Sequence, residues 1–275
     1  VAVMDAAAGS TGEPSREQLL ALGLTDVTVA NIALIQTAIR DSADDGSGVD
    51  SIAEIQALIT IVSPTFNKIE AYNNGDGTTP PALVVQDYID AGITGVTADN
   101  IVGVNAQVLA ANTGETNTVA ELNAIVALVA DTLVKVEAYN NGDGTTPAAL
   151  TLDDYAKLGI TGVDARTLDT INSQVLSADV GEANTIAEVQ ALADMANAAL
   201  DKIEAYNGGD GITPPALVVQ DYLEAGVSGV SEEILIGVNA QVLAANAGET
   251  DAVAELEAIV LSVNNTLQKI EDFNN

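Results

Sequence analysis

Three short segments of the chain carry closely spaced oxygen-bearing side chains that could bind a metal ion. They read YNNGDGTTP, YNNGDGTTP and YNGGDGITP, and they begin at Tyr72, Tyr139 and Tyr206. In the first segment Asn74, Asp76 and Thr78 stand at alternate positions, a spacing that suits a hard cation such as calcium. Glu70, one helical turn earlier, and Asp87 could add further oxygen ligands. The candidate calcium ligands at the inter-repeat loops are therefore Asp76, Asp143 and Asp210.

The same residue types also end helices and form turns. Asn and Gly tolerate the left-handed backbone, and the Asp carboxylate accepts hydrogen bonds from nearby amides. In the third segment Gly208 replaces Asn74 and Ile212 replaces Thr78, so two of the proposed calcium ligands are missing there. No segment has the full spacing of an EF-hand loop. The residues favour a turn without a cofactor, and calcium binding stays an alternative.

Catalytic groups are scarce in this composition. The chain contains no His and no Cys, which removes the most common general base and the thiol nucleophile. It also lacks the Gly-x-x-x-x-Gly-Lys loop that cradles phosphates. The sequence therefore predicts that the protein is not an enzyme.

The charge balance limits the classes of partner. Forty acidic residues against eight basic ones give a net charge of −32, which argues against nucleic acid and anionic membranes as partners. A hydrophobic content of 48% is too high for a disordered acidic chain. We find no apolar run long enough to span a bilayer. Because the chain starts at Val1 without Met, we expect a monomeric fragment of a longer protein whose partners are its own neighbouring repeats.

An internal period organises the whole chain. The three tyrosines are 67 residues apart, and a fourth copy of the preceding Ile-Glu pair closes the chain at the same interval. Such a period indicates a tandem array. The predicted repeats are residues 1–79, which include a linker remnant at 1–14, then 80–146, 147–213 and 214–275.

Each repeat is predicted to contain a short, a medium and a long helix. Thr97 is the expected N-cap of a medium helix of about four turns. The long helix of the second repeat begins with the capping box TVAE at Thr118. Its apolar residues then step by three and four, which we expect to pack against the two preceding helices; they are Val119, Leu122, Val126, Val129, Leu133 and Val136. The predicted fold is all-α, with four units of about 67 residues forming an elongated rod or solenoid.

Two polar positions recur with the same period. Asn105, Asn172 and Asn239 are interpreted as half-buried amides bonded to a backbone carbonyl, with a ligand-binding amide as the alternative. A second set lies near the end of each long helix, where a cation is favourable; its members are Lys68, Lys135, Lys202 and Lys269.

The phrases ALTLDDYAKLGITGV, GVNAQVLAAN and TVAELNAIVALVADTLVKVEAY carry a family resemblance. Together they resemble tandem helical modules in very large secreted proteins of Gram-negative, often marine, bacteria, including biofilm adhesins. The resemblance covers residues 15 to 271. It implies an extracellular spacer that holds a distal binding domain away from the cell surface. The alternatives are a protein-binding helical module, which the aromatic content of 3% disfavours, and a surface-layer subunit.

Overall fold

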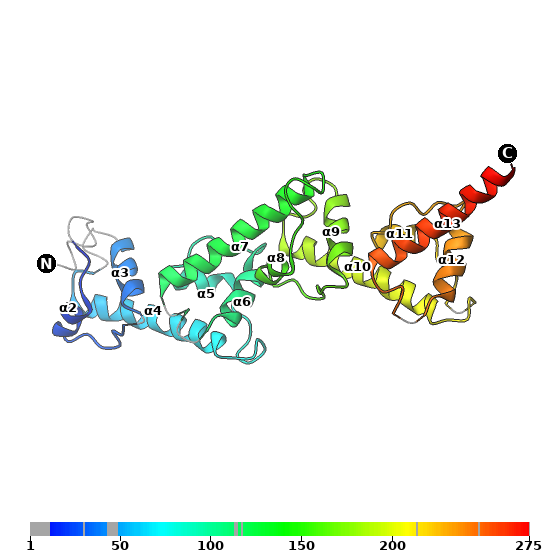
Figure 1. Ribbon diagram of the computed structural model, residues 1–275. Coiled ribbons are helices and arrows are strands. Elements are labelled where there is room, and N and C mark those ends of the chain that lie inside the picture. The colour runs from blue at the N-terminus through cyan, green and yellow to red at the C-terminus, as the bar shows by residue number, and fades with distance from the viewer. Residues whose placement is uncertain are drawn as a thin grey trace. The chain divides into compact units, whose positions relative to one another are not determined.

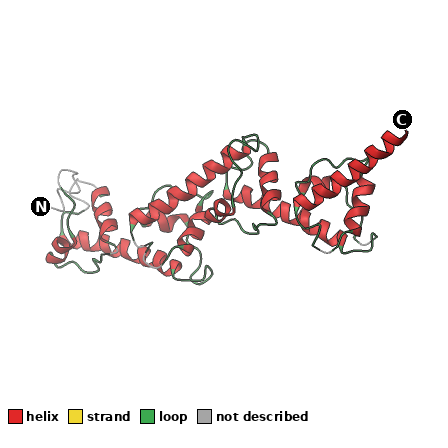
Figure 2. Cartoon of the chain, viewed as in Figure 1, coloured by secondary structure: helices red, strands yellow, loops and turns green. Residues whose placement is uncertain are grey.

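The computed structural model describes residues 12–29, 31–42, 49–112, 115–116, 118–212, 214–246 and 248–274. Over these ranges the chain is 60% helix and forms twelve helices. The described residues contain no strand, as Figure 2 shows. The predicted all-α class is therefore confirmed. Among the described helices, none is both long enough and apolar enough to cross a membrane.

Helices of three lengths follow one another in a fixed order along the chain (Figure 1). The six-residue helices are α2 (Arg16–Ala21), α5 (Val85–Asp90), α8 (Leu152–Lys157) and α11 (Val219–Glu224). The ten-residue helices are α3 (Ile32–Asp41), α6 (Ile101–Ala110), α9 (Leu168–Ser177) and α12 (Leu235–Ala244). The 22-residue helices are α4 (Ile52–Asn73), α7 (Val119–Asn140), α10 (Ile186–Asn207) and α13 (Val253–Asn274).

The medium helices start later than the sequence predicted. Asn100, not Thr97, is the N-cap residue of α6. The Asn100 side chain fixes the turn before the helix: its Oδ1 accepts from the Thr97 amide at 2.9 Å, and its Nδ2 donates to the Gly95 carbonyl at 2.8 Å. The prediction missed this because an Asn side chain that holds the preceding loop resembles an ordinary exposed helix residue in sequence.

The capping boxes of the long helices form as predicted. In α10 the Glu188 amide donates to the Thr185 hydroxyl at 3.2 Å, and the Thr185 amide donates to the Glu188 carboxylate at 3.0 Å. Thr118 and Glu121 make the same pair of bonds at the start of α7. These bonds satisfy amides that have no partner within the helix, so the starts of α7 and α10 are set by their local sequence.

The chain forms two compact units, which we describe separately. The first comprises Val1–Asp131 with Lys157–Gly159, and the second comprises Thr132–Ala156 with Ile160–Asn275. In the first unit α4 packs on α3, which precedes it, and also on α5 and α6, which follow it. In the second unit α10 contacts α9 and also α11 and α12 in the same way.

The expected packing of the long helix against the preceding helices is therefore incomplete, because α4 and α10 also pack on the short and medium helices that follow them. The reason is length: a helix of 22 residues is about 33 Å long, whereas one of ten residues is about 15 Å long. The preceding helices can cover only part of the apolar stripe. The remainder is buried by the short and medium helices that come next, so each of α4 and α10 belongs to two neighbouring helix groups.

Candidate functional site: the junction at the end of each long helix

The Asn that follows the tyrosine in each YN segment binds the next medium helix. Asn73 Nδ2 donates to the carbonyls of Val108 at 2.7 Å and Ala111 at 2.9 Å, at the C-terminal end of α6. Those carbonyls lack partners within their own helix. Asn140 makes the same bonds to Val175 and Ala178, and Asn207 makes them to Val242 and Ala245. The sequence alone did not predict these bonds, because partners 35 and 38 residues away leave no local signal.

The Asp of the same segment closes the turn. Asp76 Oδ1 accepts hydrogen bonds from the Thr78 amide at 2.8 Å, the Thr78 hydroxyl at 2.7 Å and the Thr79 amide at 2.7 Å. These bonds lower the pKa of Asp76 to about 2. Asp143 accepts the same three bonds, and Asp210 accepts one from the Ile212 amide at 2.9 Å. The structure therefore gives each candidate calcium ligand a place in a turn.

The glycine after that Asp is required for two reasons. Gly77 has φ of +82°, a left-handed backbone that residues with a side chain rarely adopt. A Cβ built there would also lie 2.9 Å from Leu109 Cδ2 on α6. A Cβ at Gly144 would lie 2.8 Å from Leu176 Cδ2, and one at Gly211 would lie 2.8 Å from Leu243 Cδ2. The turn is thus shaped to lie directly on the next medium helix.

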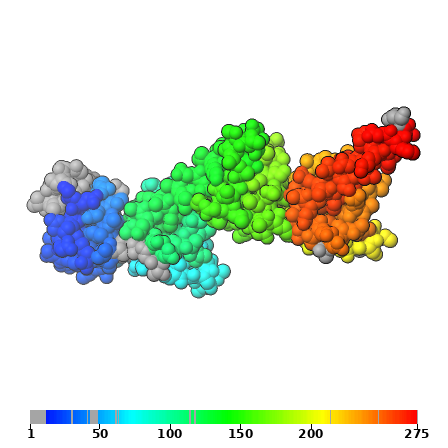
Figure 3. All heavy atoms as spheres, viewed as in Figure 1, coloured from blue at the N-terminus to red at the C-terminus, as the bar shows by residue number. Residues whose placement is uncertain are grey.

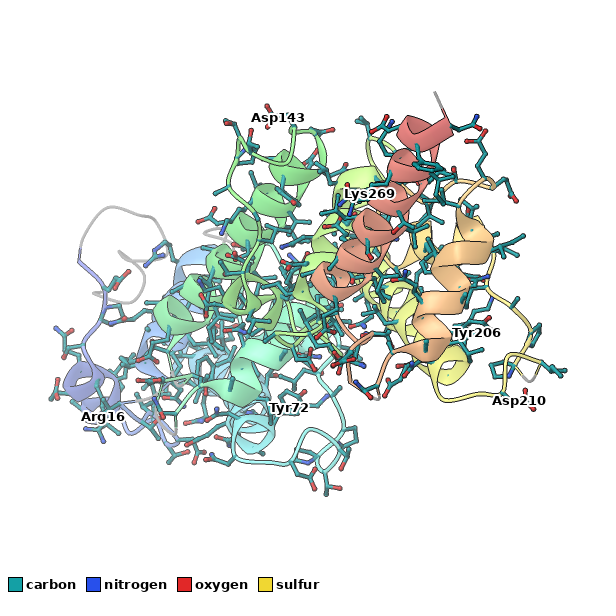
Figure 4. The ribbon with its side chains drawn as sticks, turned by 45° about the vertical axis from the view of Figure 1, so that its right-hand side comes forward. Arg16, Tyr72, Asp143, Tyr206, Asp210 and Lys269 are labelled. Carbon is teal, nitrogen blue, oxygen red and sulfur yellow. The ribbon has the colours of Figure 1, made fainter. Side chains whose placement is uncertain are left out.

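Two of the other proposed calcium ligands, Asn74 and Asp87, are engaged elsewhere. Asn74 Nδ2 donates to the Glu70 carbonyl at 2.9 Å, and Asp87 pairs with Lys68. Over the described ranges, no group of three or more acidic, His or Cys side chains could hold a metal ion. Asp143 and Asp210 lie on exposed loops, as Figure 4 shows. Calcium binding at these loops stays a prediction.

The recurring lysine has a specific partner that the sequence did not reveal. Lys68 Nζ lies 2.7 Å from both carboxylate oxygens of Asp87, and Oδ2 of Asp87 also accepts from the Val84 amide at 2.9 Å. The Asp therefore both caps the short helix and ties it to the preceding long helix. Equivalent ion pairs join Lys135 to Asp154 and Lys202 to Asp221, each at 2.5 Å.

The carboxylate of each of these ion pairs is largely buried. The side chains of Asp87, Asp154 and Asp221 are 14%, 7% and 6% exposed, whereas their lysines are about half exposed. Burial raises the pKa of Asp154, but hydrogen bonds from Lys135 and Thr151 outweigh it, and the pKa falls below its ordinary value. The prediction that these lysines lie near the helix ends holds, and their role is more specific than a general compensation of negative charge.

The recurring Asn of the medium helix is a buried structural amide, as expected. Asn105 Nδ2 donates to the Leu83 carbonyl at 2.8 Å, and its Oδ1 accepts from the Tyr88 hydroxyl at 2.7 Å. Asn172 and Asn239 repeat both bonds. Gln36 takes this place in the first repeat and donates to the Pro14 carbonyl at 3.0 Å. The tyrosine partner was missed, and burial raises the pKa of Tyr88 above its ordinary value.

A glycine at the end of each short helix completes the junction. Gly92, Gly159 and Gly226 have φ of +73°, +70° and +79°. A Cβ at Gly226 would lie 3.0 Å from Ser173 on α9, and one at Gly159 would lie 2.6 Å from Ala106 on α6. One at Gly92 would lie 3.1 Å from Leu34 on α3. The short helix therefore ends close against the medium helix that precedes it in the chain.

Comparisons with models of known protein families, with curated proteins and with solved structures find no match for this chain.

Proposed function

We propose that the chain is a tandem array of four three-helix repeats that acts as a structural spacer. The observation that carries this proposal is the identity of the contacts at three successive junctions. At the end of each of α4, α7 and α10, an Asn side chain donates hydrogen bonds to carbonyls of the next medium helix, a contact that we call the Asn clamp. A Lys–Asp ion pair also joins each of these long helices to the next short helix. A junction that repeats one geometry transmits a fixed step from repeat to repeat, and an elongated rod or solenoid results.

The net charge supports the same function. A charge of −32 makes the repeats repel one another and favours an extended array over a collapsed one. The lysines of the junction ion pairs are among only eight basic residues in the chain. Three of the eight basic residues are thus placed where neighbouring repeats must stay in contact.

In this proposal the spacer belongs to a large bacterial surface adhesin and lies outside the cell, where it holds a distal binding domain away from the surface. Support comes from the resemblance of the repeat phrases to modules of such proteins. An antibody against residues 147–213 should label intact cells of the source organism. Labelling that appears only after the cells are permeabilised would contradict this location.

A protein-binding module or a surface-layer subunit is less consistent with the exposed residues. Such a function calls for an apolar patch that recurs from repeat to repeat. Val102 and Ile236 are 57% and 83% exposed, but the matching position of the third repeat is Asp169. Leu20, Ile89 and Leu223 share a second exposed position, but there the third repeat has only the small side chain of Ala156. We propose a passive array with no catalytic role and no direct contact with membrane or nucleic acid.

Removing one repeat and measuring X-ray scattering tests the spacer. Deleting residues 147–213 joins Thr146 to Pro214 and keeps the 67-residue period, so that Lys135 faces Asp221. A compact globule of this length would have a radius of gyration of about 19 Å, and the deletion would reduce it by about a tenth. For the spacer we expect a radius of gyration clearly larger than that of the globule. The deletion should reduce this radius by about a quarter, because the length of a spacer is proportional to its number of repeats. The scattering is repeated with calcium and with chelator, which tests the calcium alternative in the same samples.

A further inference from the structure

The last long helix carries an apolar face that its counterparts bury. In α13, Leu267, Ile270 and Phe273 are 38%, 61% and 94% exposed. The residues 67 positions earlier, Leu200, Ile203 and Tyr206, are at most 4% exposed. In Figures 1 and 3 the end of α13 extends past α11 and α12. The side chains of a buried junction are thus present on α13 without the helices that cover them elsewhere.

A groove beside this face is the same surface that is filled at the inner junctions. It has a volume of about 290 Å³ and is lined by Ile234, Gly237, Gln241, Val263, Leu267 and Ile270. Gly237 corresponds to Thr170 of α9, which is fully buried and lies against Gly226 of the next short helix. Ala240 corresponds to Ser173, the other contact of Gly226, and Ala240 is exposed. The groove therefore marks where a following short helix would end.

The polar groups of the junction are retained as well. Lys269 holds the place of Lys202, which pairs with Asp221, and Asn274 holds the place of Asn207, which binds the end of α12. A partner that fits this face needs a carboxylate near the start of a short helix. It also needs a glycine at the end of that helix and free carbonyls at the end of a medium helix.

We propose that the exposed end of α12 and α13 binds a further helical repeat of the inner type, one with the Asp, Tyr and Gly of residues 214–246. A second copy of this chain docking through its own first repeat is a poor match. That repeat has Gln18 where the inner repeats have Asp and Leu19 where they have Tyr. In addition, its Ile39 carbonyl already accepts a hydrogen bond from the Ser42 hydroxyl at 2.6 Å. No carboxylate would then meet Lys269.

This binding surface rests on the proposed array of repeats. Its test measures hydrogen exchange at the end of α13 and does not depend on the overall dimensions of the chain. A copy of residues 209–275 is appended directly after Asn275, which stands where Asn74 and Asn141 stand in earlier repeats. Hydrogen exchange of the 263–274 amides is then compared in the parent and extended chains. We expect exchange to slow by about tenfold or more on extension, towards the rate of amides 196–207 in the same molecule. A compact scattering profile would refute the spacer while leaving this result intact.

The variant Ile270→Ser provides the matched control. In the parent chain Ile270 is mostly exposed, so we expect the variant to leave exchange and melting unchanged. In the extended chain it should remove most of the new protection. Unchanged exchange of 263–274 after extension would overturn the proposal, whether the appended residues fold separately or gain no helix. Slow exchange of these amides already in the unextended parent chain, together with dimers detected by light scattering, would also overturn the proposal. The partner would then be a second copy of this chain.

Discussion

The C-terminal halves of α10 and α13 have equivalent sequences and different environments. Ile203 is fully buried, and Ile270, at the same repeat position, is 61% exposed. The difference comes from α11 and α12, which pack on α10. The apolar stripe of a long helix is therefore two surfaces in succession: one packs on the medium helix that precedes it, and the other packs on the short and medium helices that follow it. The two halves also provide matched positions at which each junction contact can be tested.

The largest expected difference is between Ile203→Ala and Ile270→Ala. Truncating the buried Ile203 should lower the free energy of unfolding by about 2–5 kcal/mol, because it leaves a cavity. Truncating the exposed Ile270 should change it by no more than about 0.5 kcal/mol. Urea unfolding followed by circular dichroism measures both. Equal losses would mean that the end of α13 is buried in solution.

The next difference concerns the Asn clamp. Asn207→Ala removes two hydrogen bonds and leaves the carbonyls of Val242 and Ala245 without that donor, so we expect a loss of about 1–3 kcal/mol. Asn274→Ala, in the exposed half of α13, should have no measurable effect on stability. The same urea experiment compares the two variants. If Asn207→Ala proves neutral, water replaces the clamp and the junction depends on apolar contacts alone.

A smaller effect is expected for the ion pair. Lys202→Met keeps the aliphatic stem but removes the charge opposite the largely buried Asp221. Because the lysine is half exposed, the loss should be about 1 kcal/mol and should shrink as salt is added. Lys269→Met is the control and should be neutral. A salt-independent loss would show that the lysine contributes mainly its direct hydrogen bond to the buried Asp221 carboxylate, and not a screened surface attraction.

The smallest effect is the response of the turn to acid. The pKa of Asp76 is lowered from 3.8 to about 2 because three donors favour its charged form. Its contribution to stability is therefore fully present above pH 3.8 and is lost as the pH falls towards 2. The NMR shifts of the Thr78 and Thr79 amides should titrate with a midpoint near 2. A midpoint near 4 would mean that the turn bonds do not form in solution.

The spacing of oxygen-bearing side chains around Asp76 explains why the sequence suggested calcium as an alternative to a turn. Alternating oxygen-bearing residues look the same whether they surround a cation or hydrogen-bond their own backbone. Only the directions of the side chains distinguish the two cases. At Asp76 one carboxylate oxygen accepts all three bonds of the turn.

The sequence by itself determined the features that depend on residues close along the chain. The order of short, medium and long helices and the capping box at Thr185 follow from caps and apolar spacing within a few residues. The sequence also predicted that Asn105 bonds to a backbone carbonyl, although not which one, because an amide on an otherwise apolar helix face must find a hydrogen bond.

Only the tertiary structure decided what the end of each long helix contacts. Asn73 reaches carbonyls 35 and 38 residues away, and Lys68 pairs with a carboxylate 19 residues away. The periodicity of apolar residues does not predict such pairs. They form because a helix of 22 residues extends beyond the shorter helices that pack beside it. The surplus length of the long helix is the physical reason that one apolar stripe packs both on a helix that precedes it and on helices that follow it.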